Sequence, residues 1–413
     1  MVDEIFRLSA LDISQRIKIG EISCSEVVDS FLDRIDKINP KSNAITVVFE
    51  ELVRQMAGEL DRQKEKDSKK IFYGVPFSIK DNLDFFGVPT TKGLVALKDS
   101  MPTRSDPIVN RLMASGGIPL GKTNMPEMGM RLDTDNALFG RTLNPWDQNM
   151  TPGGSSGGDA VALATGMTPF GLGNDIGGSL RNPAYCCGIA SLKPSQGLVP
   201  WSPSIDPFDS GAPNLMLTNG PMARTVSDLK AGLSVIAGRS IYDPDSLDIS
   251  SSPVLPIKPR AGFVTQIDGF DIPEITLKRI EEAALRLEKN GWEIEETSPP
   301  ELNLVFDVWA SILRPLIESL PLDYFAEKTA NYLKRVTKES SPLNLADAML
   351  KRRFLRRIWS VFFANYTVLI GPTWCISPWR IDSDLDPDAN DTYDIGSNSL
   401  KWQDAFFSGS CDA

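Results

Sequence analysis

Two glycine-rich runs between Thr151 and Ser179 constrain the fold of this chain more than any other feature. The first, Thr151-Pro-Gly-Gly-Ser-Ser-Gly-Gly, precedes an alanine-rich segment over residues 159–165. The second, Gly171-Leu-Gly-Asn-Asp-Ile-Gly-Gly-Ser, follows shortly after. Glycine has no Cβ, so it suits places where the backbone turns tightly or where another group approaches closely. The pattern predicts two glycine-serine turns, and a helix over 159–165 that packs close to its neighbours.

Short apolar segments alternate with helical ones around these runs. Residues 75–80 and 118–122 have the pattern of strands, and Asp106-Pro107 predicts the start of a helix that ends at Gly116-Gly117. This alternation predicts an α/β layer structure with a parallel or mixed sheet. Loops that carry an active site collect at one edge of such a sheet.

The flanking parts of the chain are mainly helical. At the N-terminal side, helices are expected from Ser9 to Gly20 and from Cys24 to Ile38, where Pro40 ends the second one. At the C-terminal side, the pattern predicts a helix over 274–289 followed by a strand over 292–296, and a mostly helical region over 313–364. The Pro/Ser-rich segment 250–259 is a candidate connection between two subdomains.

The absence of histidine from all 413 residues limits the possible chemistry. A Ser-His-Asp triad, a Cys-His pair and an HExxH zinc helix are all excluded. A general base must then be Lys, Asp, Glu, Tyr or Cys. Lys80 ends the apolar segment 75–80, where burial lowers the pKa of an amine toward neutrality. Lys80 is therefore the obvious candidate for the base.

The second glycine-rich run offers a place for developing negative charge. Gly177, Gly178 and Ser179 present consecutive backbone N–H groups at an expected entry from loop to helix. Such groups can hold the oxyanion of an acyl-transfer reaction. A serine beside them is a nucleophile once a base removes its proton.

The net charge and the cysteine content limit the kinds of partner and the cellular compartment to be expected. There are 43 basic and 54 acidic residues, for a net charge of −11, which argues against nucleic acid as the main partner. The five cysteines form no CxxC pair, which suits a reducing compartment. The N-terminus has no signal-peptide pattern, and no apolar run approaches the ~18 residues of a membrane span. We expect a cytoplasmic protein with no membrane segment, no metal and no cofactor.

Several spaced motifs together resemble the amidase signature family of serine hydrolases. They include Lys80, both glycine-rich runs with the Leu-Arg-x-Pro-Ala that follows Ser179, and four further segments at 121–124, 139–146, 192–195 and 220–225. The resemblance is dense over residues 5–240 and loose beyond. It implies an α/β amidase-signature fold, in which helices cover both faces of a central mixed β-sheet.

The resemblance assigns the catalytic roles residue by residue. The family's Ser-cisSer-Lys triad falls on Ser179 as nucleophile, Ser155 as proton relay with a cis peptide bond, and Lys80 as general base. The backbone N–H groups of Ile176, Gly177, Gly178 and Ser179 are expected to form the oxyanion hole.

Other residues near these motifs receive supporting roles. Met128, Met130 and Gly154 are candidate substrate-binding residues, and Ser156, Asp175 and Arg181 are expected to support the loops, the last two as an ion pair. Lys122 is expected to be solvated or structural, and Cys186 and Cys187 to be buried packing residues. Asn174 stands where the family more often has a small hydroxyl residue.

The implied organisation has three parts. Residues 1–70 form an N-terminal helical segment, 71–240 the catalytic core, and 241–413 a variable part that completes the α/β domain and the substrate pocket. Chains of the family commonly continue beyond the position of Ala413, so we expect this last part to be shorter than usual.

The expected function is hydrolysis of a linear carboxamide through an acyl-enzyme on Ser179. Aryl amides, esters and carbamates (urethanes) suit the same groups, and the protein is expected to be a monomer or a homodimer. One alternative is a glutaminase subunit of the A type in a tRNA-dependent amidotransferase, which requires a partner subunit. Another is a non-catalytic binding protein on the same fold, although neither glycine run has the GxGxxG or GxxxxGK[ST] spacing.

Overall fold

The computed structural model of the chain describes residues 2–63, 67, 69–204, 215–248, 258–339 and 343–385. The chain forms two compact units: the first is built from residues 1–249, 321–331 and 380–384, and the second from the remaining described residues. No helix in these ranges is long and apolar enough to cross a bilayer. The predicted connection 250–259 lies almost entirely outside the described residues, as does Cys411. The predicted three-part division of the chain stays a prediction.

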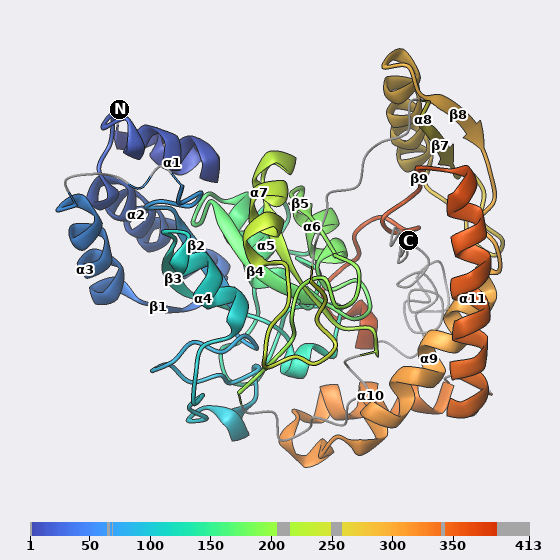
Figure 1. Cartoon of the computed structure of the whole chain (residues 1–413). Coiled ribbons are helices and arrows are strands. Elements are labelled where there is room, and N and C mark those ends of the chain that lie inside the picture. The colour runs from blue at the N-terminus through green and yellow to red at the C-terminus, as the bar shows by residue number, and fades with distance from the viewer. Residues whose placement is uncertain are drawn as a thin grey trace. The chain divides into compact units, whose positions relative to one another are not determined.

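A six-stranded mixed sheet forms the centre of the first unit (Figure 1). Its strand order is β1-β3-β2-β4-β6-β5. The central strand β2 runs parallel to both of its neighbours, and the outer pairings are antiparallel. A mixed sheet flanked by helices confirms the predicted fold class. The strands are β1 (Ile45–Val48), β2 (Pro76–Lys80), β3 (Ile118–Thr123), β4 (Phe170–Asp175), β5 (Ala190–Ser191) and β6 (Thr218–Ala223).

The three central strands end at the same edge of this sheet. β2 ends at Lys80, β3 at Thr123 and β4 at Asp175, and Lys80 pairs with Thr123 in the parallel register. Every residue of these strands is buried, as is usual for parallel strands covered on both faces. The loops that follow the three strands therefore begin side by side, at the edge where α/β proteins form their ligand sites.

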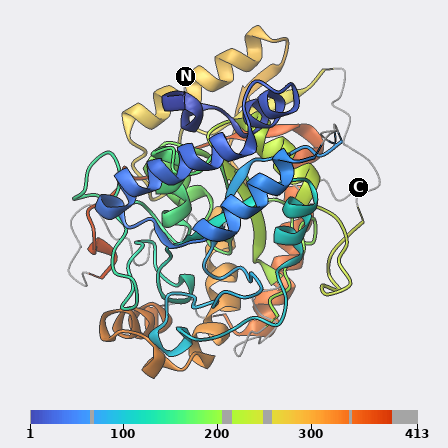
Figure 2. The same cartoon turned by 90° about the vertical axis from the view of Figure 1, so that its left-hand side faces the viewer.

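Helices lie on both faces of the sheet. Successive side chains of a strand point to opposite faces. Ser78 of β2 contacts Asp159 of α5, whereas Phe77 points to the other face, against Gly117 at the end of the α4 segment. In Figure 2 the N-terminal helices α2 and α3, drawn in blue, lie in front of the sheet. The helices of the first unit are α1 (Ala10–Lys18), α2 (Cys24–Ser42), α3 (Glu50–Asp61), α4 (Pro107–Ala114), α5 (Gly157–Ala164), α6 (Arg181–Cys187) and α7 (Val226–Ile236).

The predicted N-terminal helices form, with one correction. Ser9 caps α1 by accepting the N–H of Asp12. The prediction that Pro40 ends the second helix is wrong, because α2 continues to Ser42 and ends at Asn43 in the left-handed conformation. Proline has no backbone N–H to donate, but its fixed φ angle is that of a helix, so α2 accommodates Pro40 within its last turn.

The second glycine-rich run is a strand in its first half, which corrects the predicted turn. Phe170–Asp175 forms β4 in the middle of the sheet. A Cβ on Gly171 would lie 2.9 Å from Ser78 Oγ, and a Cβ on Gly173 would lie 2.8 Å from Ser156 Oγ. Glycine is required at both places by the close approach of these side chains. Only the second half of the run forms a turn.

The second unit has its own sheet. Three parallel strands lie in the order β8-β7-β9. The predicted helix over 274–289 forms, and helical structure in the next region begins at Leu302, earlier than expected. The elements are β7 (Arg260–Phe263), α8 (Glu274–Lys289), β8 (Glu293–Glu296), α9 (Leu302–Ser319), α11 (Leu345–Asn365) and β9 (Val368–Ile370), and α10 (Glu327–Glu339) begins in the first unit and continues in the second.

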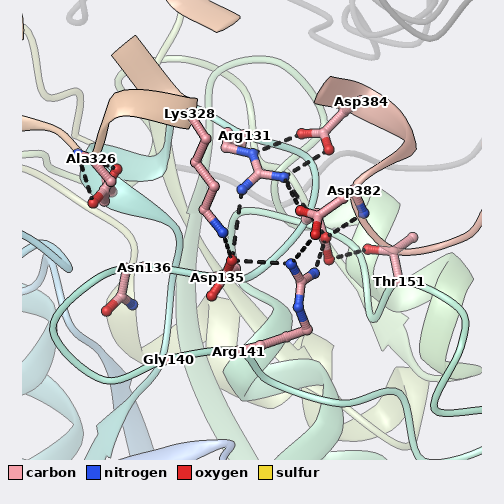
Figure 3. A network of polar contacts seen from close by, with 12 residues as sticks. Arg131, Asp135, Asn136, Gly140, Arg141, Thr151, Ala326, Lys328, Asp382 and Asp384 are labelled. Carbon is pink, nitrogen blue, oxygen red and sulfur yellow. Dashed lines mark hydrogen bonds and ion pairs between the residues drawn. The ribbon is translucent and has the colours of Figure 1, made fainter. Parts of the chain in front are cut away.

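A network of charged side chains joins distant segments of the first unit (Figure 3). Arg131 is buried and donates to both carboxylate oxygens of Asp384, at 2.9 Å from Nε and 2.8 Å from Nη2. It also donates to Asp382 at 3.0 Å. Arg141 donates to Asp135 at 3.0 Å and to Asp382 at 2.6 Å. We call this network the charge clasp; its members are Arg131, Asp133, Asp135, Arg141, Lys328, Asp382 and Asp384.

The charge clasp attaches residues 321–331 and 380–384 to the loops that follow β3. Three of its carboxylates, from Asp133, Asp382 and Asp384, lie close enough together to suggest a metal site. Guanidinium groups already bond to all three of them. The arginines therefore balance the charge of these carboxylates, and this donor set fits ion pairing better than a metal ion.

We expect Asp384→Asn to lower the free energy of unfolding by about 3 kcal/mol. The substitution leaves the buried Arg131 guanidinium with one counter-charge fewer, and breaking one side of a buried ion pair costs about 3–5 kcal/mol. Denaturant unfolding followed by circular dichroism measures the change. The matched control is Glu21→Gln, which breaks the exposed pair with Arg16 and is expected to cost less than about 1 kcal/mol. Equal small losses in both variants would mean that the clasp adds no stability.

Candidate active site

Lys80 and Ser155 meet at the carboxyl edge of the central sheet. The Nζ atom of Lys80, the last residue of β2, lies 2.7 Å from Ser155 Oγ and hydrogen-bonds to it. The peptide bond between Gly154 and Ser155 is cis. Burial lowers the pKa of Lys80 to about 7, although the charges of Asp159 and Asp175 act to raise it. An amine with this pKa is partly neutral at physiological pH and can accept a proton.

Two asparagines complete the surroundings of Lys80, and neither was predicted as a site residue. Asn174 Oδ1 accepts a hydrogen bond from Lys80 Nζ at 2.8 Å. The amide groups of Asn174 and Asn82 bond to each other in both directions, at 2.9 Å and 3.2 Å. For Asn174 the sequence did contain a signal, because a polar side chain stands there in a buried strand, at a position where the sequence departs from its family pattern. Asn174 fixes the direction of the amine.

Ser179 lies in the turn between β4 and α6. Asp175 organises this turn, since its carboxylate accepts the N–H groups of Gly178 at 2.7 Å and Leu180 at 3.0 Å. The predicted ion pair forms: Arg181 donates to the same carboxylate at 2.9 Å and 3.0 Å. Burial raises the pKa of Asp175, but the charge and hydrogen bonds of Arg181 outweigh burial and hold it at about 2. Asp175 is therefore ionised, and its role is to shape the turn.

Fewer backbone N–H groups of this turn are left to donate to a ligand than the sequence predicts. The N–H of Gly178, predicted as an oxyanion donor, is donated to Asp175 instead. In the described part of the chain, the N–H groups of Gly177 and Ser179 have no acceptor within hydrogen-bond distance. Ile176 begins the turn and is half-buried. Of the predicted oxyanion donors, Gly177 and Ser179 are thus the ones whose N–H groups no described residue accepts.

Ser156 links the two glycine-rich segments. Its N–H donates to the carbonyl oxygen of Ser179 at 3.2 Å, and its hydroxyl donates to the carbonyl oxygen of Asn174 at 3.4 Å. These contacts agree with the supporting role expected of Ser156, and they bring the loop of Ser155 beside the turn of Ser179. No hydrogen bond joins the Ser155 and Ser179 hydroxyls in this part of the described structure.

Neighbouring segments hold the loop that carries Ser155. Asn182 of α6 accepts the N–H of Gly154 at 3.1 Å, and Thr134 donates to the preceding carbonyl at 2.8 Å. A Cβ on Gly154 would lie 2.5 Å from the carbonyl oxygen of Arg131. Glycine is thus needed at position 154 because the backbone of the Arg131 segment approaches it closely. Asn182 is a further supporting residue that sequence reasoning missed.

The candidate substrate-binding methionines lie beside this loop. Met128 belongs to the short 3-10 helix η3 (Glu127–Gly129), and Met130 follows it; both are half-buried. A Cβ on Gly129, between them, would lie 3.0 Å from Ser155 Oγ. The two methionines are thus the sequence neighbours of a residue that lies next to Ser155, and their contact with substrate stays a prediction.

Two further sequence expectations concern residues outside the reaction. Lys122 is buried rather than solvated, and its ammonium donates to the carbonyl of Leu83, so it is structural. Cys186 and Cys187 are buried as predicted, and burial raises the pKa of both thiols. Neither thiol has the thiolate character of a nucleophile.

Comparison with known families assigns the chain to a family. The family model described as Amidase matches residues 26–403. The chain belongs to the amidase family. The sites reported above lie within the matched residues, and the resemblance stated from the motifs is confirmed.

Relatives of this amidase include amide hydrolases and A subunits of glutamyl-tRNA(Gln) amidotransferase. It is 35% identical over 386 residues to indoleacetamide hydrolase of Bradyrhizobium diazoefficiens. The aligned residues make up 91% of this chain and 73% of that protein. It is 32% identical over 382 residues to an acylamidase of Rhodococcus erythropolis, with 89% and 79% coverage. A bacterial aryl acylamidase structure superposes with a TM-score of 0.80 at 26% identity, covering 97% of this chain and 86% of that one. This amidase is accordingly a hydrolase of amide C–N bonds.

Proposed function

We propose that this amidase cleaves its substrate through an acyl-enzyme on Ser179, with Ser155 as proton relay and Lys80 as general base. The observation that carries the proposal is the 2.7 Å hydrogen bond between the buried Lys80 amine and the Ser155 hydroxyl, in a chain without histidine. A buried amine with a pKa near 7 can take a proton at neutral pH.

Acylation begins when Ser179 Oγ attacks the carbonyl carbon of the amide. Its proton passes to Ser155 Oγ as the Ser155 proton passes to Lys80 Nζ. The N–H groups of Gly177 and Ser179 are placed to donate to the resulting oxyanion. The C–N bond then breaks, and a proton returns from Lys80 through Ser155 to the leaving nitrogen. The products of this half-reaction are a free amine or ammonia and an ester on Ser179.

Deacylation repeats the route with water. Water attacks the ester carbonyl and transfers its proton through Ser155 to Lys80, and the proton then returns to Ser179 Oγ as the carboxylic acid departs. The relay needs a hydrogen bond between the two serine hydroxyls, and catalytic hydrogen bonds often tighten only in the substrate complex. Asn174 holds Nζ in place through both halves, because its amide oxygen accepts from that atom.

The proposed substrates are linear carboxamides with an aromatic part. The named activities of the relatives, indoleacetamide hydrolysis and aryl acylamide hydrolysis, support an aromatic group on either side of the amide. Esters and carbamates suit the same chemistry, because each presents a carbonyl carbon with a leaving group. The described cysteines are free and buried, which supports a reducing, cytoplasmic location, and we propose a monomer or homodimer that needs no cofactor.

A substrate panel tests this function. The purified protein is given indole-3-acetamide, an acyl anilide, a matched ester and a matched carbamate, and release of ammonia, amine or alcohol is measured. We expect turnover of the aromatic primary amide or the anilide, with the ester hydrolysed as well. Turnover of glutamine alone, together with co-purification of a second subunit, would favour the amidotransferase alternative instead. That alternative is weaker, because the match to an amidotransferase A subunit covers 74% of this chain, whereas the match to indoleacetamide hydrolase covers 91%. Absence of any turnover would favour the non-catalytic alternative.

A further inference from the structure

Asp159 is a buried carboxylate beside Lys80 that the proposed reaction does not use. It lies in the first turn of α5 and has no exposed surface. Its Oδ1 accepts from the Ser78 hydroxyl at 2.8 Å, and its Oδ2 accepts from the Thr123 hydroxyl at 2.6 Å. Ser78 lies two residues before Lys80 on the same face of β2, and Thr123 pairs with Lys80 from β3. The carboxylate is therefore anchored to the two strands that position the amine.

The other charges around Lys80 are already balanced. Asp175, at the end of β4, is paired with Arg181. Asp81, the next residue along the chain, interacts with the charge of Lys122 on β3. Among the described residues, Asp159 forms no ion pair within 4 Å, so it is not in direct contact with the Lys80 amine. It is the carboxylate near Lys80 whose charge no neighbouring cation takes up.

We propose that Asp159 is a positioning residue for the reaction, whose carboxylate balances the proton that Lys80 accepts and thereby sets the basicity of Lys80. This inference rests on the proposed role of Lys80 as general base. Asp159 itself transfers no proton and does not touch the substrate.

The physical reason is the cost of forming an ammonium group in a buried site. Proton transfer from Ser155 creates a positive charge on Lys80 where little water can solvate it, and such a charge is costly unless a counter-charge is near. The Ser78 and Thr123 hydroxyls hold Asp159 in a fixed place, and these hydroxyls and the N-terminus of α5 favour its ionised form. Burial raises the pKa of this carboxylate, and the two hydroxyls and Lys80 oppose that rise.

The separation of the two groups suits a catalyst. The Lys80 amine has Ser155 and Asn174 as its hydrogen-bond partners, so it stays directed at the relay. A carboxylate in direct contact would occupy one of these directions and hold the ammonium form more tightly. At its observed place Asp159 acts through its charge alone.

The test compares Asp159→Asn with the wild-type protein in a pH profile of kcat/KM. Asparagine keeps the size of the side chain and one of its two acceptor oxygens, and it removes the charge. The Lys80 ammonium then loses its counter-charge, so its pKa falls and the acid limb of the profile moves to lower pH by about 1 unit. Above the limb, kcat is expected to fall about tenfold, because the base is weaker. Asp159→Ser, which also removes the charge, is expected to shift the limb in the same direction and serves if the asparagine variant does not fold.

Asp228→Asn is the matched control. Asp228 is also fully buried and accepts two hydrogen bonds, from the N–H groups of Ala10 and Leu11, far from the sheet edge. The acid limb of the Asp228→Asn profile is expected to coincide with that of the wild-type protein. An unmoved limb in folded Asp159→Asn, or a limb moved to higher pH, would overturn the inference. Failure of the proposed function is distinguishable, because it appears as retained activity in Lys80→Met.

Discussion

Replacing Ser179 by alanine is expected to lower kcat for amide hydrolysis by at least about 10⁴-fold. The substitution removes the one atom that bonds to the acyl group in the proposed mechanism. The loss should appear in kcat rather than in KM, because the side chains placed to bind substrate remain. Stability is expected to change little, since the Ser179 hydroxyl makes no hydrogen bond in the described structure and the side chain is small.

The control for this variant is Ser14→Ala in α1. Ser14 is likewise a buried serine whose hydroxyl has no hydrogen-bond partner, and it lies outside the active site. Its substitution is expected to leave kcat within about twofold of the wild-type value, since only a hydroxyl without a bonding role is lost. Steady-state kinetics with one amide substrate compares the two variants. Ser179→Ala that retained more than a few per cent of wild-type activity would contradict the assignment of the nucleophile.

The second large effect is expected for the base. In the wild-type protein, kcat/KM should fall tenfold for each pH unit below about 7 and stay level above it. The sign follows from the protonation state: below its pKa, which burial lowers to about 7, Lys80 is an ammonium group and cannot accept the Ser155 proton. Lys80→Met keeps the apolar length of the side chain and is expected to lower kcat by at least about 10³-fold.

The pH measurement requires a substrate without a titratable group, so that the profile reports the enzyme. A single acid limb near pH 7 would support an amine base. A limb near pH 4 would instead report a carboxylate base, and activity retained in Lys80→Met would exclude Lys80 altogether.

The residues proposed for catalysis could be singled out from the sequence because each has a local chemical signature. An amine that ends an apolar strand and a serine that follows two glycines can be recognised from the neighbouring residues alone. Capping residues such as Ser9 and Asp106 likewise mark the starts of α1 and α4 through their own hydrogen bonds.

Other features depend on residues that are distant in the sequence. The pair formed by Arg131 and Asp384 joins positions 253 residues apart, and no local pattern predicts it. The assignment of the Gly171 segment to a turn failed for the same reason, because the side chains that require glycine there come from β2 and α5. The N–H of Gly178 was expected to face substrate, and only the structure places the Asp175 carboxylate against it.

The roles of Asn174 and Asp159 illustrate the same limit. Either residue, taken alone, is an ordinary polar side chain next to a glycine-rich motif. Their significance arises from the sheet register, which places Asn174 beside the Lys80 amine and the Ser78 and Thr123 hydroxyls around Asp159. Tertiary placement turns these residues into the immediate environment of the base.

Covalent labelling tests the central claim, acylation of Ser179, most directly. The purified protein is incubated with a fluorophosphonate probe, and the adduct is located by intact-mass measurement and peptide mapping. The mechanism predicts one adduct per chain, on Ser179, which forms more slowly below pH 7 and is absent from Ser179→Ala. Active protein that remains unlabelled at Ser179, or that carries the adduct on another residue, would contradict it.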